Sequence, residues 1–190
     1  MPWSRYILGY HGCDAETAGK IAAGKDELRP SQNDYDWLGH GLYFWEDGYE
    51  RALRWATEQS KSKRPQNRIK NPGVLGAVID LGHCLDLIQV EYLDLVKDAH
   101  DRMLQLFAEI EKDPPINAGR EMSLRKLDCA VFESLHQFSD NESQPRFNTV
   151  RAFFTEGEAL YPTAGIRRLD HIQICVRDKA SITGYFLPRQ

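Results

Sequence analysis

Apolar and aromatic residues gather along this chain in short runs that are closed by glycine, proline or aspartate. Runs of this kind are typical of strands that are buried on one or both faces. The first run ends in a turn at His11 and Gly12. The pattern predicts strands within residues 5–12, 73–82, 149–157, 171–178 and 182–188.

Between these runs, apolar residues recur three or four positions apart, which is the spacing of amphipathic helices. Asp14 is placed to cap a first helix that ends near Gly24, and a second helix begins near Asp47. The middle of the chain predicts an amphipathic helix in two pieces over residues 85–112. Two adjacent prolines then break the pattern, and a further helix is expected over residues 123–138.

The order of these elements indicates the fold class. Strand patterns stand at both ends of the chain and helical patterns cluster in the middle, which predicts an α+β domain rather than an alternating parallel-sheet fold. A chain of 190 residues is long enough for one domain with a sizeable core. Its 42% hydrophobic and 27% charged residues are ordinary for a globular protein, so we do not expect disorder over most of the chain.

Charge and cysteine content narrow the functions open to the chain. The formal net charge of -4 gives no general attraction to nucleic acid or to an anionic membrane, so either partner would need a local basic patch such as residues 61–70. The four cysteines are scattered and form no metal-like cluster with histidine. Without a signal peptide or a long apolar run, we expect reduced thiols, no metal, no membrane and a cytoplasmic location.

Three short motifs carry the candidate chemistry. They occupy residues 10–12 ("YHG"), 39–44 ("GHGLYF") and 171–176 ("HIQICV"). In the second motif, glycines that let the backbone turn or approach a ligand lead directly into aromatic side chains with flat faces. This combination indicates a site for a flat ligand.

In this order and at this spacing, the motifs resemble those of the ADP-ribosyltransferase superfamily, in particular its diphtheria-toxin and poly(ADP-ribose) polymerase branch. That branch has a His-Tyr-Glu signature, and "HGC" and "GHGLYF" match its first two parts. The position of the glutamate falls on Gln173. The resemblance covers the two ends of the chain. It implies a single ADP-ribosyltransferase-like domain over residues 1–190, with a split β-sheet core and a helical insertion at about residues 85–140.

The resemblance implies that NAD is bound and consumed as a co-substrate, with rupture of the bond between nicotinamide and its ribose. Tyr43 and Trp55 would then supply flat faces for the nicotinamide ring, and the backbone of Gly12 would hold its carboxamide. His11 would hydrogen-bond the adenosine ribose. The NAD-binding residues implied in this way are His11, Gly12, Cys13, Gly41, Tyr43 and Trp55.

The catalytic residues implied are His11, Tyr43, Gln173 and Glu156. Gln173 keeps the hydrogen-bonding shape of the usual glutamate, but it carries no charge and cannot take a proton. Glu156 and Glu158 have the E-x-E spacing of the arginine-modifying branch of the superfamily, and on an extended strand the two would share a face. The alternative is a polar turn between strands.

Three interpretations of function remain open. The first is an NAD-dependent mono-ADP-ribosyltransferase acting on a protein or nucleic acid, as bacterial toxins and defence effectors do, with Arg29 and residues 31–34 near the NAD pyrophosphate. The helical segment would suit the docking of an inhibitor or antitoxin protein. The second interpretation changes the acceptor to water, which makes an NAD glycohydrolase, or to an RNA phosphate.

An enzyme of the RNA 2'-phosphotransferase type would need basic residues that converge on the phosphate. The candidates are residues 61–70, Arg146, Arg151, Arg167 and Arg168. The third interpretation is a catalytically silent module that binds NAD or ADP-ribose, since a substituted third motif such as Gln173 can accompany loss of turnover.

Overall fold

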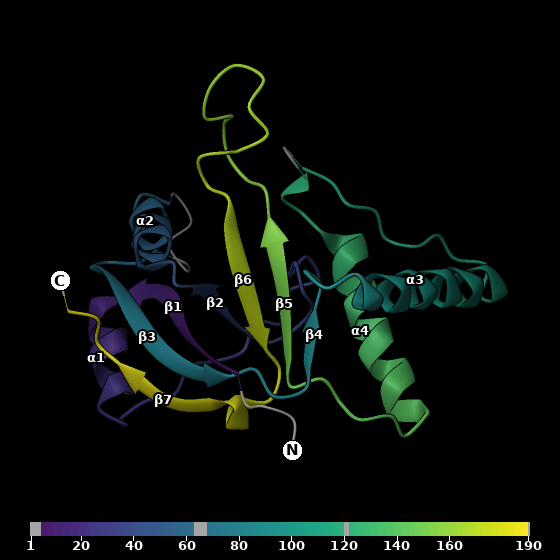
Figure 1. Ribbon diagram of the computed structural model, residues 1–190, viewed down its shortest axis with the longest axis horizontal. Helices are drawn as coiled ribbons and strands as arrows, with labels where there is room; N and C mark the ends of the chain where they lie inside the picture. Colours follow the sequence, from purple (N-terminus) through teal and green to yellow (C-terminus); the bar gives the residue numbers. More distant parts are fainter. Residues whose placement is uncertain (1–4, 63–67, 120–121, 190) are drawn as a thin grey trace.

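The computed structural model describes residues 5–62, 68–119 and 122–189 and has one mixed sheet flanked by helices (Figure 1). The strands lie in the order β4-β5-β6-β2-β1-β3-β7, and every neighbouring pair is antiparallel except β4 with β5. The strands are β1 (Tyr6–Asp14), β2 (Leu42–Glu46), β3 (Pro72–Asp80), β4 (Cys84–Asp86), β5 (Thr149–Phe154), β6 (His171–Val176) and β7 (Ile182–Phe186). The described part of the chain has the helices α1 (Ala15–Ala22), α2 (Tyr49–Ser60), α3 (Glu91–Glu109) and α4 (Lys126–Asn141) and a 3₁₀ turn (Lys179–Ser181).

The sheet is nearly divided between β1 and β2. Strand β1 pairs with β3 over nine residues, whereas its ladder with β2 has two pairs, Gly9 with Glu46 and Tyr10 with Trp45. One half of the sheet therefore contains β4, β5, β6 and β2, and the other contains β1, β3 and β7. Beyond Tyr10 the two halves separate.

Helices α1 and α2 pack on opposite faces of the β1–β3–β7 half. Helix α1 buries Ala18 and Ile21 in a core that includes Leu75 of β3. Helix α2 buries Ala52 beside Val74, the preceding residue of β3. Because successive residues of a strand point to opposite faces, the two helices enclose this half of the sheet.

Helices α3 and α4 form a separate layer beside β4 and β5 (Figure 1). Met103 of α3 and Leu135 of α4 share one core with Leu85 and Val150 of the two strands. The loop between β5 and β6, residues 155–170, projects from the end of the sheet that lies near α2. This loop reaches the edge of the gap between the two halves.

The structure confirms the α+β class and the five predicted strand regions, and a further strand, β2, begins within the second motif. Asp14 caps α1 as predicted, because its carboxylate accepts a hydrogen bond from the Glu16 N–H at 3.1 Å. The predicted helices near residues 47–62 and 123–138 correspond to α2 and α4. The sequence marks these elements by hydrophobic periodicity or by a capping residue, and for this reason they could be predicted.

The prediction of a two-piece helix over residues 85–112 is wrong at its beginning. Residues 84–86 form β4, which pairs in parallel with β5, and one continuous helix, α3, follows. Asp86 at the end of β4 is buried and bound by Arg151 at 3.1 Å. Strand pairing and this ion pair outweigh the local helical spacing.

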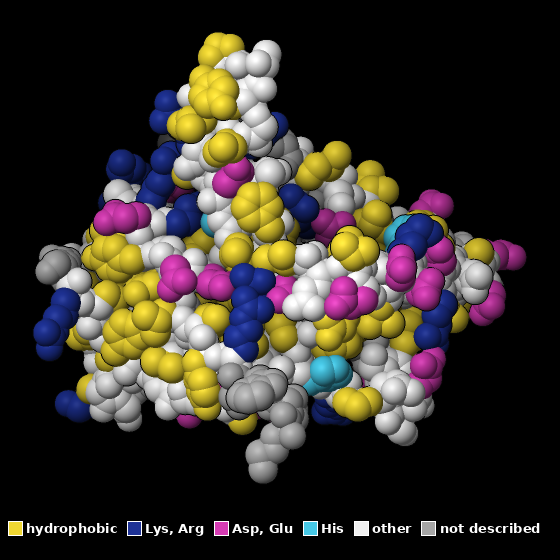
Figure 2. All heavy atoms as spheres, in the orientation of Figure 1, with side chains coloured by type: hydrophobic (Ala, Val, Ile, Leu, Met, Phe, Trp, Pro, Cys, Tyr) yellow, Lys and Arg dark blue, Asp and Glu magenta, His cyan; other side chains and the backbone are white. Residues whose placement is uncertain are grey.

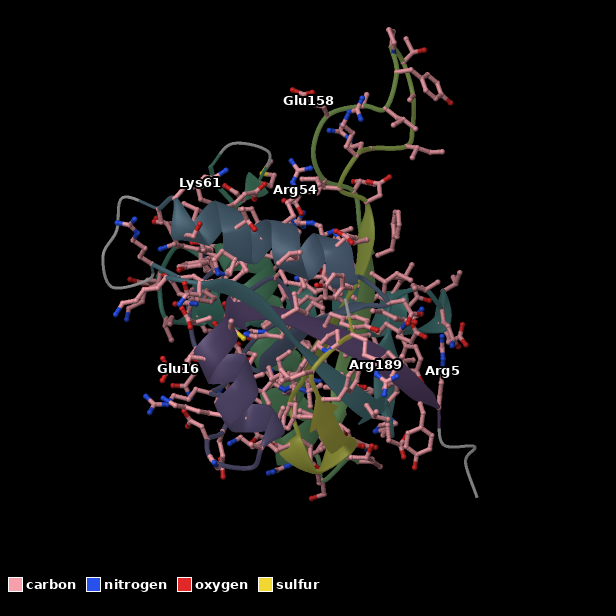
Figure 3. All side chains as sticks on the ribbon, turned by 90° about the vertical axis from the view of Figure 1, so that its left-hand side faces the viewer. Arg5, Glu16, Arg54, Lys61, Glu158 and Arg189 are labelled. Atoms are coloured by element: carbon pink, nitrogen blue, oxygen red, sulfur yellow. The ribbon has the colours of Figure 1, made fainter. Side chains whose placement is uncertain are left out.

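Of the two interpretations of Glu156 and Glu158, the structure contradicts a shared strand face and agrees with the alternative, a polar turn between strands. Strand β5 ends at Phe154, and Gly157 has a φ of 81°, which extended strands do not adopt. Glu156 turns toward the gap in the sheet, whereas Glu158 is exposed on the projecting loop (Figure 3). The two carboxylates therefore do not act from one strand face.

Candidate functional site

A cavity of about 660 Å³ opens where the two halves of the sheet separate. Its lining comes from β1, β2, β6, α2, the loop before β2 and the β5–β6 loop. Residues that the sequence places far apart thus meet at the split. The residues expected at the site that line this cavity are His11, Tyr43, Trp55, Glu156 and Gln173.

The side chain of His11 binds a carbonyl group of β2 that the backbone of β1 would bind if the β1–β2 ladder continued. If the ladder continued in register, Gly12 would stand opposite Tyr43. Instead, the imidazole Nδ1–H of His11 donates to the Tyr43 carbonyl oxygen at 2.8 Å. Because a carbonyl oxygen only accepts, Nδ1 carries the proton and Nε2 is left as an acceptor. Burial holds the pKa of His11 below its ordinary value of 6.5, against the opposing effect of this hydrogen bond, so the ring is neutral at pH 7.

The backbone of Gly12 faces the gap that results. The Leu8 carbonyl accepts from the Asp47 N–H at 2.9 Å on the β2 side, and every second residue of a strand directs its backbone groups to the same side. The N–H and C=O of Gly12 therefore point toward β2, beyond the last ladder pair. A Cβ at Gly12 would lie 2.4 Å from the Ala52 carbonyl oxygen and 3.1 Å from the Trp55 ring, so glycine also allows α2 to pack against β1.

The glycines of the second motif position Tyr43. Its hydroxyl donates to the Gly39 carbonyl at 2.6 Å and accepts from the Leu38 N–H at 2.8 Å. Gly39 has a φ of 79°, which a side chain would strain, and burial raises the pKa of the Tyr43 hydroxyl. A Cβ at Gly41 would lie 2.5 Å from the Cys175 Sγ, so this glycine permits the close approach of β6.

Cys13 and Arg29 do not reach the cavity. Cys13 packs in the core beneath α1, where burial raises the pKa of its thiol to about 11. Arg29 is exposed and lines a different depression near the end of α1. By contrast, Ser31 and Asn33 of the same loop line the cavity, and the Ser31 hydroxyl donates to the Asp36 carboxylate at 2.8 Å.

Gln173 and Glu156 line the β6 side of the cavity. Gln173 stands opposite Trp45 in the β2–β6 ladder. The Glu156 carboxylate is 2.7 Å from Nη2 of Arg51 on α2 and 3.7 Å from Nδ1 of His171. This ion pair ties the start of the β5–β6 loop to α2 across the cavity.

Among the lining residues to which the sequence analysis gave no role are Trp37, Trp45, Arg51 and His171. Trp45 Nε1, Arg51 Nε and Nη1, and His171 Nε2 are buried and have no hydrogen-bond partner within the described residues. Nearly all buried polar atoms in proteins are paired, so these atoms indicate a ligand. Trp37 and Trp45 flank the second motif in the sequence, so they could have been predicted to lie at the site. His171 is the first residue of the third motif, but Arg51 gave no signal, because its role depends on a contact with Glu156, which is distant in the sequence.

Among the described residues, Arg146, Arg151, Arg167 and Arg168 do not line this cavity. Arg151 is buried between Glu46, at 2.6 Å, and Asp86, at 3.1 Å. Arg146 lies at the far end of β5, and residues 167–168 are exposed on the projecting loop.

Part of the basic run at 61–70 cannot be placed, because residues 63–67 lie outside the described residues. Across residues 5–62, 68–119 and 122–189, no three His, Cys, Asp or Glu side chains are grouped to hold a metal ion. In the same ranges, no helix has the length and apolar character needed to cross a membrane.

Comparison with known proteins finds a relative that aligns with nearly the whole chain. The chain is 36% identical over 200 residues to a protein of Methanocaldococcus jannaschii that is named uncharacterized protein MJ0359. The alignment covers 96% of this chain and 86% of the archaeal protein. No family model and no solved structure matches the chain.

Proposed function

The chain belongs to the family of the uncharacterized protein MJ0359 of Methanocaldococcus jannaschii, and we propose that it is an NAD-dependent mono-ADP-ribosyltransferase that acts on a macromolecular acceptor. One observation carries the proposal: the cavity at the split of the sheet is lined by residues of all three motifs. His11, Tyr43 and Gln173 come from β1, β2 and β6, and they meet there. A split sheet with its site in the gap is also what an ADP-ribosyltransferase-like fold requires.

The residues on the β1 side fit the nicotinamide end of NAD. Tyr43 and Trp55 line the cavity and supply aromatic rings. Gly12 is not among the lining residues, but its backbone N–H and C=O point to the β2 side beyond the last ladder pair. His11 directs an acceptor, Nε2, that suits a ribose hydroxyl. The volume of about 660 Å³ lies within the range of pockets that hold small molecules.

The reaction transfers the ADP-ribosyl group from nicotinamide to the acceptor. The bond between the anomeric carbon and the nicotinamide nitrogen breaks, its electron pair stays on nicotinamide, and neutral nicotinamide leaves. The acceptor atom supplies the electron pair of the new bond and loses a proton, which the Glu156 carboxylate is placed to accept. Gln173 orients the ribose by hydrogen bonds but adds no negative charge, so we expect single transfers rather than polymer formation.

The test is incubation of the purified protein with NAD labelled in the adenine half, with and without cell lysate, while free nicotinamide and the label are followed. We expect nicotinamide release together with label fixed to a macromolecule. Nicotinamide release with free ADP-ribose alone would establish a glycohydrolase instead. Intact NAD in a protein that binds it would establish a silent binding module.

A paired substitution makes this test specific to the cavity. His11→Asn retains a donor for the Tyr43 carbonyl but removes the Nε2 acceptor, so we expect NAD consumption to fall at least about tenfold while the melting temperature is kept. The control is His83→Asn, an exposed histidine outside the cavity, which should consume NAD at the unaltered rate. Equal rates in the two variants would contradict the assignment of His11.

The third motif is tested by Gln173→Glu. A carboxylate at this position would stabilise positive charge that develops at the anomeric carbon, so we expect faster release of nicotinamide. An unchanged rate would mean that the position of the third motif has been assigned wrongly.

A further inference from the structure

Helix α4 packs one side of its surface against the loop before β2. Three of its contacts with this loop come from residues three and four positions apart, so they lie on one side of the helix. They are Lys126 with Asp34 at 2.7 Å, the Cys129 thiol with the Asn33 carbonyl at 3.4 Å, and the Glu133 carboxylate with the His40 N–H at 2.8 Å. The loop contributes Ser31, Asn33 and Trp37 to the cavity at the split, so α4 supports one wall of that cavity.

The contact at Glu133 includes a second charged residue. Arg177, directly after β6, has its Nη1 2.6 Å from the Glu133 carboxylate, and the same nitrogen donates to the His40 carbonyl at 3.0 Å. The N–H and the C=O of His40 are therefore both bound, the first by the glutamate and the second by the arginine. Because the side chains of Glu133 and Arg177 are only 31% and 19% exposed, salt screens this pair less than a surface pair.

This ion pair also borders Gly39, the first residue of the second motif. Gly39 has a φ of 79°, and a Cβ there would lie 2.5 Å from Oε1 of Glu133 and 3.0 Å from Nη1 of Arg177. The Gly39 carbonyl accepts the hydroxyl of Tyr43 at 2.6 Å. Because glycine can adopt many backbone conformations, the direction of this carbonyl depends on the contacts around it. The ion pair thus fixes the peptide between Gly39 and His40, and this peptide holds the Tyr43 ring.

The direction of Glu133 contrasts with the surface of the α3–α4 layer. Figure 2 shows charged side chains of both signs over the outer part of this layer, at the right of the view. Glu133 of the same layer instead faces the second motif. Burial by itself would raise the pKa of Glu133, but hydrogen bonds from Arg177 and the His40 N–H hold this pKa below its ordinary value of 4.5, so the carboxylate is charged at pH 7. A partly buried charge depends on its partners, so loss of one partner disturbs the others.

We infer that Glu133 and Arg177 are positioning residues for the cavity at the split, which hold the second motif so that the Tyr43 ring meets the nicotinamide of NAD. The inference rests on the proposed function. Neither residue lines the cavity, so an effect of either on NAD must pass through the second motif. The helical segment, which the superfamily resemblance leaves as an insertion, thus has a part in completing the site.

The first test does not involve NAD. Amide hydrogen exchange over residues 38–44, measured by mass spectrometry, reports how firmly the second motif is held, because the Leu38 and His40 amides are bonded in this network. Glu133→Ala removes the acceptor of the His40 N–H and should speed exchange at least about tenfold. The control is Asp140→Asn on the same helix, where the carboxylate binds Arg146 at 2.7 Å, and it should leave exchange unchanged. Equal exchange in the two variants would overturn the inference.

NAD affinity is measured next, by calorimetry, which needs no turnover. A misplaced Tyr43 ring weakens a contact made before the chemical step, so Glu133→Ala should raise the Kd for NAD at least about tenfold and change kcat less. Glu133→Gln keeps an acceptor for the His40 N–H but no charge for Arg177, and its Kd should be intermediate. Asp140→Asn should bind NAD like the unaltered protein. A pair that only stabilises the fold would lower the melting temperature and leave the Kd unmoved.

Arg177→Lys tests the other member of the pair and remains informative where Glu133→Ala impairs folding. Lysine keeps the positive charge but lacks the planar fork of arginine, so the Kd for NAD should rise severalfold. Combined with Glu133→Gln, the effect should be smaller than the product of the two single changes, because both substitutions weaken the same contact. Fully independent effects would mean that the two residues do not act as a pair, and the inference would fail.

The two measurements separate the inference from the proposed function. Faster exchange in Glu133→Ala with an unchanged Kd for NAD would overturn the inference and leave the proposed function standing. An unaltered protein that neither binds nor cleaves NAD would remove the proposed function, and the inference with it, whatever the exchange rates show. Faster exchange together with weaker NAD binding, both absent from Asp140→Asn, supports the inference.

Discussion

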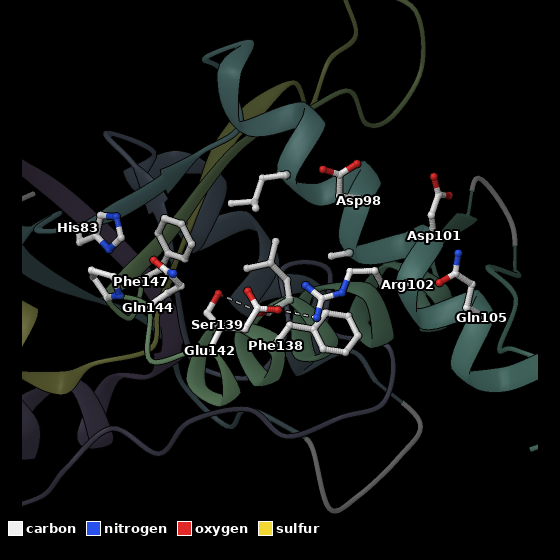
Figure 4. A pocket seen from close by; sticks show the side chains of 14 residues that line it. His83, Asp98, Asp101, Arg102, Gln105, Phe138, Ser139, Glu142, Gln144 and Phe147 are labelled. Carbon is white, nitrogen blue, oxygen red and sulfur yellow. Dashed lines mark hydrogen bonds and ion pairs between the residues drawn. The ribbon is translucent and has the colours of Figure 1, made fainter. Parts of the chain in front are cut away.

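Two cavities of similar size in this protein differ in how their polar side chains are satisfied. The cavity at the split of the sheet has about 660 Å³, and the cavity between α3 and α4 has about 600 Å³. In the α3–α4 cavity, Arg102 binds Glu142 at 2.7 Å and lies over the Phe138 ring (Figure 4). At its other end, His83 Nδ1 donates to the Arg146 carbonyl at 2.9 Å.

The cavity at the split has the opposite character. Trp45, Arg51 and His171 keep buried polar atoms without a partner among the described residues. Its lining is also drawn from both ends of the chain, whereas the α3–α4 cavity is lined mainly by two neighbouring helices. Volume alone does not identify a site. A group of unsatisfied polar atoms around one cavity is a stronger indication, because burying them is unfavourable unless a ligand pairs them. Beside the α3–α4 cavity, His136 Nε2 is also buried without a partner among the described residues, but it does not belong to such a group.

The largest expected effect is on the rate of ADP-ribosyl transfer. It is tested by substituting one ion-paired glutamate from each cavity. Glu156→Gln keeps the shape of the side chain but removes the proton acceptor, so transfer should fall by about 10² to 10⁴ with little change in NAD affinity. Glu142→Gln should leave transfer unchanged and cost at most about 1 kcal/mol, because its pair with Arg102 is half exposed. Rates and chemical denaturation are measured for both. Equal transfer rates in the two variants would remove the distinction between the cavities.

The next largest effect is a dependence of folding stability on pH. It comes from a histidine that lies beside the α3–α4 cavity. Burial, with a contribution from Arg177, lowers the pKa of His136 from 6.5 to about 4. The unfolded chain therefore binds a proton at higher pH than the folded chain, and stability is lost as pH falls from 6.5 toward 4. The loss is roughly 3 kcal/mol at the lower limit.

Melting curves between pH 7 and pH 4 measure this effect. His136→Leu should flatten the decline, while burial of His11 and His171, whose pKa values are also lowered, leaves a residual slope. His83→Leu is the control on an exposed histidine. NAD consumption at pH 7 should be the same in both variants. An unchanged slope in His136→Leu would assign the acid sensitivity to the cavity at the split instead.

The smallest effect tests the contact between α2 and β1. Gly12→Ala places a Cβ 2.4 Å from the Ala52 carbonyl oxygen, so the helix must move, at a cost of about 1 to 3 kcal/mol. Trp55 moves with α2, and NAD affinity should fall with stability. Gly19→Ala on α1 meets nothing within 4 Å and should stabilise the protein by up to about 1 kcal/mol. Loss of stability in both variants would mean that the packing at Gly12 is not special.

Local signals explain which parts of the fold could be predicted. The cap at Asp14, the amphipathic α2 and α4, and the apolar runs of β1, β3, β5, β6 and β7 follow from short-range periodicity and end signals. Strand β4 could not be predicted from such local signals. It has three residues and is fixed by its pairing with β5 and by the ion pair of Asp86 with Arg151. The same limit placed the end of the predicted strand over residues 149–157 three residues beyond Phe154, where β5 ends.

The sequence by itself determined the α+β class and the motif residues that line the cavity, because these depend on residue type and spacing. Only the tertiary structure decided that His11 replaces a ladder bond opposite Tyr43 and thereby frees the backbone of Gly12. It also decided that Arg51 meets Glu156, a residue 105 positions away, and that His171 adjoins Trp45. Contacts of this kind depend on the order of strands in the sheet, which local periodicity does not encode.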